Sequence, residues 1–468
     1  MIREVTALLK GTELVILFIS LAYFSGYSVG YGFARRLSME KIRKLALVAW
    51  AFHLTLPFSF RYLGAFLHVQ QAQALAFLLL LFLTAFALSA FYSVLLPRFI
   101  DLAPDEGASL VRYYSAELVG AIGGAVALFL VGRSGWATAV VYQAALAVLI
   151  GLLWRRRVVW AAAAALVAVY ALIQPTANAR SLSYSYASIQ GLHGPRLLSS
   201  ANTFYQRVDY LEDDAGQTYI YLNGRMNYGS DVLRVFNEVL SRLPASVVHP
   251  KQALIVGSGS MASVKSVSEL AEHVTTVELD QAVIEGSRRY LATVNHVADI
   301  RNWTLHINDA KQFLGSTDQE FDLIVMDVPA PTNLQLGLLH TVDFYRLAKS
   351  RLTPHGVISV SLSGVFAPDH EIPQTVTAAL VAAFPDVVVY SDAGSSASFA
   401  LGGDSFSFTS EDLEKAAEEL GLEEFTIYER PEILEIVKGI EPMTADNMRV
   451  IVKRSWYRIE MLFGGGDD

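Results

Sequence analysis

The sequence predicts two domains of different class. A multi-span α-helical membrane domain is followed by an α/β domain with a doubly wound parallel sheet and a small β-region at its start. Three observations predict this layout. Apolar segments long enough to cross a bilayer recur through residues 1–175. The balance of charge reverses between the two parts, and strand-like and helix-like segments alternate after residue 251.

Composition supports this division and excludes several classes of function. The chain has 468 residues, too many for one ordinary domain, and 53% of them are hydrophobic. Residues 1–180 hold 15 basic and 7 acidic residues, whereas the remainder holds 21 and 38. The acidic second part would repel phosphates, so no nucleic acid partner is expected. Because there is no cysteine, disulfides, thiolate nucleophiles and cysteine-ligated metals are excluded, and no metal site is predicted.

The membrane domain is predicted from the length of its apolar segments. We expect about six helices, with five or seven as alternatives, at 13–33, 44–60, 72–97, 116–132, 136–154 and 158–174. The third segment is the clearest, because it holds no charge over more than 20 residues. Small residues at four-residue spacing, Gly26/Gly30 and Gly120/Gly124, would let neighbouring helices approach closely.

Glu117 is the candidate functional residue of the membrane domain. It lies near the start of an apolar segment, where an ionisable side chain is costly unless it faces a partner or water. We expect either a functional role or a structural pairing with Arg112 or another helix.

The side of the membrane on which the second part lies stays open. Ten basic residues fall on the connections that six spans place on one side. The positive-inside rule then puts the N-terminus and the α/β domain outside. A domain that uses a cytosolic nucleotide would instead need a seventh span or the reverse orientation.

A linker and a small β-region are predicted after the membrane domain. Residues 176–204 are rich in Ser, Gly, Asn and Pro, which is typical of a linker. Residues 205–250 are expected to form the β-region, with strands at 205–211 and 218–224 and a helix at 230–243.

The α/β domain proper is predicted over 251–403. Strands are expected at 252–256, 274–280, 303–307, 321–327 and 356–362, with helices at 262–270, 281–292 and 341–352. Strands and helices that alternate at this spacing favour a parallel, doubly wound sheet. Residues 404–468 are expected to add a C-terminal α/β element, with an acidic helix at 409–421 and a flexible glycine-rich tail.

Glycines and acids stand at the predicted strand ends. In a doubly wound sheet, ligands bind beyond the carboxyl ends of the strands. Gly257, Gly259, Glu278, Asp309 and Asp327 all fall there. The glycines allow a tight turn and a close approach of a ligand to the backbone. Glu278 lies 21 residues beyond Gly257, the separation at which an acidic side chain accepts hydrogen bonds from ribose hydroxyls.

The glycine loop alone would also fit NAD, so an NAD-linked membrane oxidoreductase is an alternative. Dinucleotide sites use a helix N-terminus to hold a pyrophosphate. An S-adenosylmethionine-type ligand has no phosphate and is held by acids, here Glu278 at the ribose and Asp309 at the adenine. Asp327 would then lie near the sulfonium, where a carboxylate can orient an amine and take its proton. The structural alternative for Asp327 is a helix cap or a loop anchor.

Several phrases resemble the spermidine synthase (polyamine aminopropyltransferase) family over roughly 200–365. They are Tyr205-Gln206, Leu222-Asn223-Gly224, Gly257 to Ala262, "VELD", Asp309-Ala310, "DLIVMD" and "LLHTVDFYRLAKSRLTPHGVIS". The membrane half is similar to multi-span regions fused to such domains in bacteria, where a Tyr-x-x-Asp-x-x-Gly-x-x-x-Gly phrase recurs. Tyr114 to Gly124 matches that phrase, with Glu117 replacing the Asp. The resemblance implies a Rossmann-like fold of the S-adenosylmethionine-dependent methyltransferase type, in an integral protein of the bacterial inner (plasma) membrane.

The resemblance also implies roles for individual residues. In the family, an amine attacks the methylene beside the sulfonium of decarboxylated S-adenosylmethionine. Asp327 would be the catalytic residue that positions and deprotonates this amine. The nucleoside would be held by Gln206, Gly257, Ser258, Gly259, Ser260, Glu278, Leu279, Asp309 and Ala310. The amine would be held by Tyr205, Asn227, Glu238, Val328 and Tyr345.

Departures from the family pattern bear on the donor. Ser260 replaces a loop Asp that grips the donor's free amine, and Ala330 replaces an Asp that helps to hold the diamine. Asn227 replaces a Gln, and Asn237-Glu238 replaces a His-Glu pair. Losing a charge-assisted hydrogen bond costs roughly 1.5–3 kcal/mol, so ordinary spermidine synthesis should be impaired. A serine can donate a hydrogen bond to the carboxylate of intact S-adenosylmethionine, and plant putrescine methyltransferases of this fold also lack the loop acid.

We therefore expect a membrane-bound transferase that alkylates an amine with decarboxylated or intact S-adenosylmethionine, and aminopropyl transfer is named first. One alternative is methyl transfer or other sulfonium chemistry on the same fold. Another is a transporter or channel gated by a nucleoside-sensing domain, without catalysis. The expected partners are a small-molecule amine or a membrane-delivered acceptor, the lipid bilayer, and a second copy of the chain in a homodimer.

Overall fold

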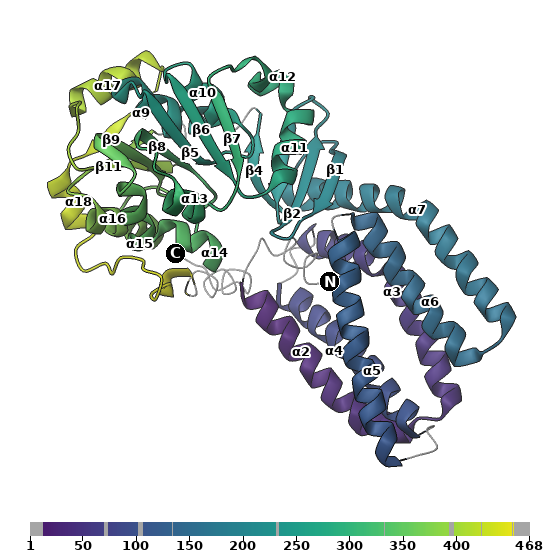
Figure 1. Ribbon diagram of the computed structural model, residues 1–468. Helices are drawn as coiled ribbons and strands as arrows, with labels where there is room; N and C mark the ends of the chain where they lie inside the picture. Colours follow the sequence, from purple (N-terminus) through teal and green to yellow (C-terminus); the bar gives the residue numbers. More distant parts are fainter. Residues whose placement is uncertain are drawn as a thin grey trace. The chain divides into compact units, whose positions relative to one another are not determined.

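The chain divides into two compact units (Figure 1). The computed structural model describes residues 13–69, 74–101, 106–132, 134–230, 234–331, 333–392, 397–422, 424–451 and 453. The first unit, called the helical unit, extends to Gly216 and includes Tyr221–Arg225. The second, called the α/β unit, holds Gln217–Ile220 and the residues from Met226 onward. The predicted glycine-rich tail lies outside the described residues.

Six long helices make up most of the helical unit within the described residues. They are α2 (Glu13–Phe33), α3 (Met39–Val69), α4 (Ala74–Asp101), α5 (Glu106–Val131), α6 (Gly135–Trp154) and α7 (Arg157–Gln190), with the 3-10 helix η1 (Ala34–Arg36) after α2. Each long helix overlaps one of the six predicted apolar segments. In this part of the chain, α2, α5, α6 and α7 have the length and apolar composition that a membrane crossing needs, and α4 holds a shorter apolar stretch, Leu79–Leu95.

Glycines bring α2 against α4. A Cβ atom on Gly26 or Gly30 would collide with the backbone of α4, so the predicted close approach is made here. Gly120 and Gly124 on α5 differ, because no described atom lies within 4 Å of their Cβ positions. The predicted close approach is therefore absent at these two glycines within the described residues.

Helix α7 extends much further than the sequence suggests. The expected linker at 176–204 is helical to Gln190, and strand β1 follows it. The Ser, Asn and Pro content of this segment is misleading, because Ser181, Leu182, Ser185 and Tyr186 recur at helical spacing and are buried. Pro175 is accommodated inside the helix.

The β-region is a four-stranded sheet in the order β1-β2-β3-β4. Its strands are β1 (Arg196–Asn202), β2 (Arg207–Glu212), β3 (Thr218–Leu222) and β4 (Arg225–Gly229). The two predicted strands are thus β2 and β3, and β1 pairs antiparallel with β2. Asn223 and Gly224, at φ values of 49° and 74°, make the two-residue turn between β3 and β4.

The predicted helix at 230–243 is a helical segment of mixed type. It consists of α8 (Arg234–Asn237), the π-helical turn η2 (Glu238–Arg242) and α9 (Leu243–Val248). Single π-helical turns occur frequently at functional sites. Glu238, predicted to hold the amine, is the first residue of this turn.

The α/β unit is built on an eight-stranded sheet in the order β12-β10-β11-β9-β8-β5-β6-β7. Its strands are β5 (Gln252–Gly257), β6 (His273–Glu278), β7 (Trp303–Ile307), β8 (Phe321–Asp327), β9 (Leu352–Ser361), β10 (Asp386–Asp392), β11 (Ala397–Gly403) and β12 (Thr426–Tyr428). Strand β5 pairs parallel with β6 and β8, which in turn pair parallel with β7 and β9. Strand β11 runs antiparallel to β9 and β10. This is a Rossmann-type α/β fold of the methyltransferase kind.

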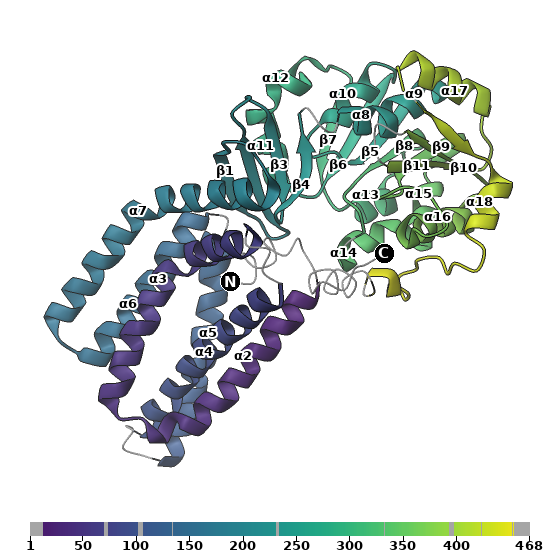
Figure 2. The ribbon, with the colours of Figure 1, turned by 180° about the vertical axis from the view of Figure 1, so that it is seen from behind.

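Helices cover both faces of this sheet (Figures 1 and 2). They are α10 (Ala262–Ser268), α11 (Gln281–Tyr290), α12 (Ala292–Asn295), α13 (Ala310–Ser316), α14 (Leu334–Gly337), α15 (Val342–Lys349), α16 (Glu371–Ala383), α17 (Ser410–Glu419) and α18 (Arg430–Ile436), with the 3-10 turns η3 (Val297–Asp299) and η4 (Leu338–His340). Successive residues of β5 belong to different cores: Leu254 packs with α15 and α16, and Ile255 packs with α9 and α10. A strand buried on both faces explains the continuous apolar run in the sequence.

The predicted acidic helix at 409–421 is α17. Thr409 accepts a hydrogen bond from the Asp412 N–H, and the Asp412 side chain bonds back to the Thr409 N–H, which makes a capping box. Leu413, Ala416 and Ala417 form its buried face. The acidic residues therefore lie on the exposed side, as the amphipathic pattern predicts.

Candidate active site

The loop between β5 and α10 is tied to the end of β8. Gly257 ends β5 opposite Asp327 in the parallel register, with a φ of +88°. A Cβ atom here would collide with the Asp327 carbonyl, so only glycine fits. Ser258, also at positive φ, donates its N–H to the same carbonyl at 3.0 Å. The loop therefore places the glycine turn next to Asp327.

The second glycine brings the loop against the end of β6. A Cβ atom on Gly259 would collide with Val283 and lie 3.4 Å from Oε2 of Glu278. Oε1 of Glu278 accepts a hydrogen bond from the Asp280 N–H at 2.9 Å. Although Glu278 is partly exposed as a residue, its carboxyl group is withdrawn from water. This desolvation raises the pKa of Glu278 to about 7, against the lowering effect of the Asp280 hydrogen bond.

Asp327 is joined to helix α10 through a serine. Its Oδ2 accepts a hydrogen bond from the Ser263 hydroxyl at 2.7 Å. Burial raises the pKa of Asp327, and the Ser263 and Ser258 hydroxyls lower it. The buried Ser258 hydroxyl has no partner of ordinary hydrogen-bond geometry, although it lies close enough to act on this carboxyl group. Although Asp327 is partly exposed as a residue, its carboxyl group is withdrawn from water, and a carboxylate with a raised pKa is suited to accept a proton.

Ser260 is buried inside the loop. Its hydroxyl accepts a hydrogen bond from the Ala262 N–H at 3.3 Å, and its carbonyl accepts one from the Asn295 side-chain amide. Asn295 in turn accepts a hydrogen bond from the Tyr228 hydroxyl at 3.4 Å. Ser260 is therefore held by uncharged groups. The family that the sequence resembles has an aspartate carboxylate at this position.

The third predicted acid caps a helix. Asp309 is exposed, and its Oδ1 accepts a hydrogen bond from the Gln312 N–H at 3.0 Å, which begins α13. Its contact with an adenine stays a prediction. Leu279 is partly exposed between Glu278 and Asp280, whereas Ala310 is buried in the hydrophobic core.

The residues predicted to hold the amine lie on separate elements. Asn227 is on β4 and Glu238 opens η2, and both are partly exposed. Val328, directly after Asp327, packs against the hydrophobic core. Their contact with an amine stays a prediction.

Tyr345 differs from the other residues predicted to hold the amine because it is fully buried in the hydrophobic core. Its hydroxyl lies 3.1 Å from Nδ1 of the buried His340. Burial lowers the pKa of His340 to about 4, and the nearby Pro329 backbone opposes this shift, although the buried Nε2 of His340 has no partner of ordinary hydrogen-bond geometry. Because Pro329 is two residues beyond Asp327, His340 lies near the segment that follows the acid.

Tyr205 and Gln206 belong to the helical unit, in the turn between β1 and β2. Their N–H groups donate to Oγ1 of Thr203 at 3.1 and 3.0 Å. Tyr205 is 47% exposed, so its ring is open to solvent in this structure. Their roles at a nucleoside and an amine stay predictions. Glu117 lies exposed on α5.

Sequence reasoning missed the residues that support the site. Ser263 could have been found, because it lies in the first turn of the helix after the glycine loop, beside a strand end. Asn295 and His340 carry no such signal. The partner of Asn295 in the loop is 35 residues away, and the burial of His340 depends on the packing of α15.

The arrangement suits a nucleoside and an amine. Two carboxyl groups, from β6 and β8, flank a glycine loop at the carboxyl ends of neighbouring parallel strands. One can accept hydrogen bonds from ribose hydroxyls, and the other can accept a proton. Within the described ranges, no group of three or more His, Asp or Glu side chains is arranged to hold a metal ion.

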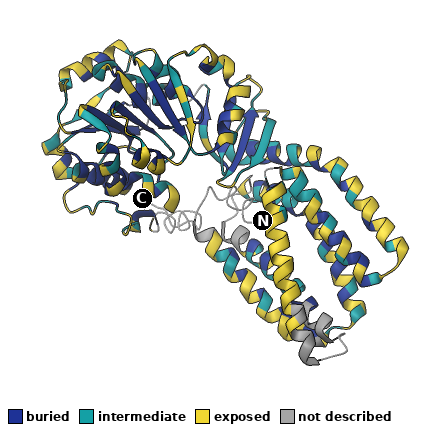
Figure 3. Cartoon of the chain, in the orientation of Figure 1, coloured by how far each residue is buried: buried dark blue, intermediate teal, exposed yellow. Residues whose placement is uncertain are grey.

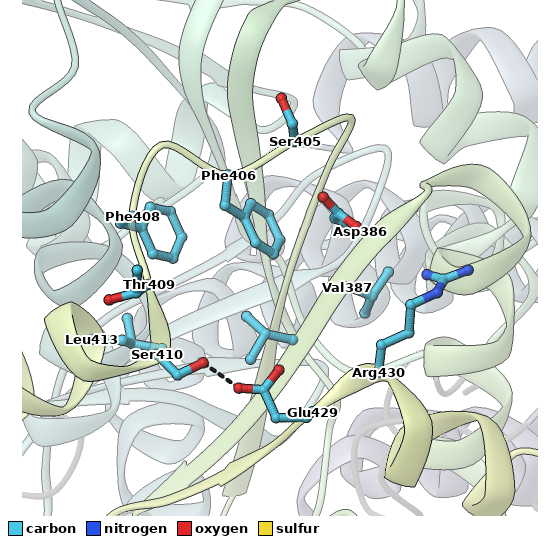
Figure 4. A pocket seen from close by; sticks show the side chains of 11 residues that line it. Asp386, Val387, Ser405, Phe406, Phe408, Thr409, Ser410, Leu413, Glu429 and Arg430 are labelled. Atoms are coloured by element: carbon cyan, nitrogen blue, oxygen red, sulfur yellow. Dashed lines mark hydrogen bonds between the residues drawn. The ribbon is translucent and has the colours of Figure 1, made fainter.

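A separate cavity of about 440 Å³ lies in the α/β unit (Figure 4). Its lining includes Asp386 at the start of β10, Phe406, Phe408, Ser410 at the start of α17, and Arg430. Strand β10 begins at the edge of the sheet opposite to the one where β5, β6 and β8 end. The cavity contains none of the predicted site residues.

Comparisons with known proteins agree with the geometry. Residues 234–393 match the spermine/spermidine synthase domain. The polyamine aminopropyltransferase of Oceanobacillus iheyensis is 32% identical over 190 residues, which cover 38% of this chain and 36% of that protein. The polyamine aminopropyltransferase of Thermoanaerobacter sp. strain X514 is 28% identical over 167 residues, covering 35% of this chain and 60% of that protein. These matches span less than two thirds of the relatives' own lengths.

Among solved structures, the spermidine synthase from Thermotoga maritima is similar at 20% identity and a TM-score of 0.41, covering 56% of this chain and 87% of that chain. The family match includes the glycine loop, Glu278, Asp309 and Asp327, and it lies outside the long helices. Residues 234–393 of this chain are therefore a domain of the spermine/spermidine synthase family.

Proposed function

We propose that this chain transfers an alkyl group from an S-adenosylmethionine-type sulfonium donor to an amine, and that this group is the aminopropyl group of decarboxylated S-adenosylmethionine. One observation carries the proposal. Asp327, an acid with a raised pKa, ends the strand beside a glycine turn, and Glu278 ends the strand on the other side. The names of the relatives, polyamine aminopropyltransferases, support the same chemistry.

The residues present fit the nucleoside of such a donor. Glu278 would accept hydrogen bonds from the ribose hydroxyls, and Gly259 leaves room for the ribose because it has no side chain beside that carboxylate. The buried Ser258 hydroxyl, without a partner of ordinary geometry, has a hydrogen bond to offer. Asp309 would reach the adenine amine with the carboxylate oxygen that does not cap α13.

The chemistry follows from the position of Asp327. The lone pair of the amine attacks the methylene beside the sulfonium, a C–N bond forms, and the C–S bond breaks. The electron pair of that bond passes to sulfur, so a neutral thioether nucleoside leaves. Asp327 orients the amine and accepts the proton that its nitrogen loses. Ser263, hydrogen-bonded to Oδ2, holds the carboxylate in place.

Product formation tests this proposal. Full-length protein in detergent would be incubated with decarboxylated S-adenosylmethionine and 1,4-diaminobutane, and the products would be measured by mass spectrometry. We expect the thioether nucleoside and the aminopropylated amine in equal amounts, and neither without the diamine. Thioether formed without alkylated amine, or no product from either form of the donor with a panel of primary amines, would contradict the proposal.

Ser260 favours a second candidate, methyl transfer from intact S-adenosylmethionine. An aspartate at this position would attract the ammonium of the decarboxylated donor and repel the carboxylate of the intact one. Ser260 carries no charge, so the discrimination should be weak. Titration calorimetry with both donors tests this: the wild type should show no strong preference, and Ser260→Asp should shift binding towards the decarboxylated form. A strong wild-type preference for the decarboxylated donor, unchanged in Ser260→Asp, would exclude this reading.

We propose further that the helical unit is integral to a membrane, the bacterial inner membrane being the expected one. The long apolar helices support this, since four of those described have the length and composition of membrane spans. A bilayer would cover their exposed apolar side chains. Separation of full-length protein between the membrane and soluble fractions after an alkaline carbonate wash tests it: the protein should stay with the membranes.

A further inference from the structure

The turn between β1 and β2 lies where α5 ends and α6 begins, within the helical unit. The Cβ position of Gly135, the first residue of α6, is 3.7 Å from Nδ2 of Asn202 at the end of β1. In the turn itself, the ring centroid of Phe204 is 5.6 Å from that of Phe129 near the end of α5. The turn is therefore packed against the ends of two long apolar helices.

The apolar stretches of three helices end at this level. The membrane-length stretch of α5 ends at Val131 and that of α6 begins at Gly135, with only residues 132–134 between them. A connection this short brings both helices to the same membrane surface. Nε1 of Trp136 donates a hydrogen bond to the carbonyl of Ala171 on α7 at 2.9 Å, three residues before the predicted apolar segment of α7 ends. The level of the turn is thus the level at which the chain would leave the bilayer.

Aromatic side chains at this level are open to the surroundings. Phe129 is 66%, Phe204 60% and Trp136 47% exposed. An indole whose N–H is bonded while its apolar ring faces outward is typical of the membrane–water interface. The exposed apolar face of α5 continues directly into Phe129 and the Phe204 ring that it contacts. The bilayer that would cover α5 would therefore also cover Phe204.

A buried acid fixes the turn to α7. Asp209 on β2 is 0% exposed, and its Oδ1 accepts a hydrogen bond from the Ser200 hydroxyl on β1 at 2.6 Å. Its Oδ2 accepts hydrogen bonds from the Tyr186 hydroxyl on α7 at 2.6 Å and from Nε of Arg207 at 2.7 Å. Moving β1 and β2 away from α7 would remove a partner from a buried carboxylate, which is strongly unfavourable.

We propose that Phe204 lies in the bilayer interface, and that the amine alkylated by this chain is drawn from the lipid phase, as a primary amine with a hydrocarbon tail. The inference rests on the proposed alkyl transfer and on the membrane position of the helical unit. Tyr205, predicted to hold the amine, follows Phe204 directly. The ammonium group of an amphiphile stays among the headgroups while its tail lies among the acyl chains, so its nitrogen is presented at the level of this turn. The transfer step is unchanged: the C–N bond forms, the C–S bond breaks, and Asp327 accepts the proton.

Fluorescence quenching tests the position of the turn without any turnover. Because the chain has no cysteine, Phe204→Cys can carry a single bimane fluorophore in full-length protein reconstituted into phosphatidylcholine vesicles. Part of the lipid would bear a nitroxide on its acyl chain, near the headgroup or near the chain end. Ile122→Cys, within the apolar stretch of α5, and Glu418→Cys on α17 are the matched controls, and both residues are exposed.

We expect nitroxide lipid to quench the Phe204 label severalfold more strongly than the Glu418 label. The shallow nitroxide should quench the Phe204 label better than the deep one, and the Ile122 label should show the reverse order. A Phe204 label that is quenched no more than the Glu418 label would overturn the interfacial position. If the Phe204 label were also shielded from iodide in the water, a second copy of the chain would cover it instead.

The acceptor class is tested in the same vesicles with butylamine and dodecylamine, which share one reacting group. We expect the KM for dodecylamine to be about tenfold lower or more, with kcat values within about threefold, because only the longer amine partitions into lipid. Phe204→Ser should raise the KM for dodecylamine severalfold and leave that for butylamine unchanged, at an unchanged thermal unfolding midpoint. Equal KM values for the two amines would overturn the lipid-phase acceptor.

These failures are distinct from failure of the proposed function. Transfer with equal KM values would keep the transferase and remove the lipid-phase acceptor. No transfer to any amine would remove both the transferase and its acceptor class, and quenching of the Phe204 label would still decide where the turn lies.

Discussion

The helical unit and the α/β unit differ in the burial of their residues: the strands of the eight-stranded sheet are mostly buried, whereas the described part of α5 is mostly exposed (Figure 3). In the α/β unit, Leu254 on β5 and Ile324 on β8 are 0% exposed, because helices cover both faces of the sheet. On α5, Val119 is 68% and Ile122 63% exposed, and none of the stretch Tyr114–Val131 is buried. The α/β unit thus completes its own core, whereas α5 needs apolar surroundings that the described residues do not supply.

Their polar side chains differ as well. In the α/β unit, the side chains predicted to be functional lie at strand ends and bond to nearby loops, as Glu278 does with Asp280. In the helical unit, buried polar side chains bond to one another across helices, as Trp50 does with Gln143 at 3.0 Å. At a sheet edge, the order and direction of the strands decide which acids lie together. In a helix bundle, contacts between helices far apart in the sequence decide which polar side chains meet.

In the α/β unit, we expect the largest effect from adding a side chain at Gly257. We expect Gly257→Ala to lower the free energy of unfolding by about 2–4 kcal/mol and to abolish nucleoside binding, since a Cβ collides with the Asp327 carbonyl at a φ of +88°. Chemical denaturation and titration with a thioether nucleoside measure both effects. Gly315→Ala on α13 is the matched control, because nothing lies within 4 Å of its Cβ position. Equal behaviour of the two variants would contradict the account of the loop.

The exposed face of α5 can be probed with cysteine, because the chain has none of its own. In protein reconstituted into lipid vesicles, Val119→Cys should react with a membrane-impermeant maleimide about tenfold or more slowly than Glu418→Cys on α17, since lipid shields the first. Both residues are exposed in the structure. The same comparison in denaturant should remove the difference. Equal rates in vesicles would mean that α5 faces water.

Glu278 should make nucleoside binding depend on pH. The pKa of Glu278 in the folded protein, about 7, lies above its ordinary value of 4.5. Between pH 4.5 and pH 7 the folded protein therefore holds a proton on Glu278 that the unfolded chain has lost. The stability that this proton contributes is lost as the pH rises through this range. Ribose hydroxyls donate to the ionised form, so the affinity for a thioether nucleoside should rise up to about tenfold from pH 6 to pH 8. Glu278→Gln should bind weakly with a flat pH profile. A profile that is unchanged in this variant would assign the titration to another group.

Among these substitutions, Tyr345→Phe should have the smallest effect. Because it is buried against His340, Tyr345→Phe should lower the free energy of unfolding by about 1–2 kcal/mol, the cost of leaving the His340 nitrogen without its partner. The KM for the amine should not change, which titration of the acceptor in the product assay would show. A large increase in KM at unchanged stability would instead support the predicted contact of Tyr345 with the amine.

The strands that carry the site can be predicted from the sequence. Strands β5, β6 and β8 are apolar runs bounded by turn residues, and their ends follow from the glycine or acid that comes next. Glu278 and Asp327 lie at the same edge of the sheet because parallel strands share one direction. Asp309 shows where prediction from the sequence stops. An acid at this position fits a ligand contact and a helix cap equally well, and in the structure Asp309 caps α13.

Features that depend on distant packing could not be predicted. The burial of Tyr345 and His340 is decided by the fit of α15 against the sheet, which a family phrase does not encode. His53 meets Tyr142, 89 residues away, and no periodicity links them. The end of α7 looks like a linker by composition, but its buried residues recur at helical spacing over 181–186. Local composition is a poor guide where tertiary contacts stabilise a helix.

The most direct test of the central claim compares the wild type with Asp327→Asn in the amine alkylation assay, at saturating donor and amine. If Asp327 accepts the proton of the amine, the turnover rate should fall about 10²–10⁴-fold. The affinity for the thioether nucleoside should stay within about threefold, a change of less than 1 kcal/mol. An Asp327→Asn rate close to that of the wild type would contradict the account.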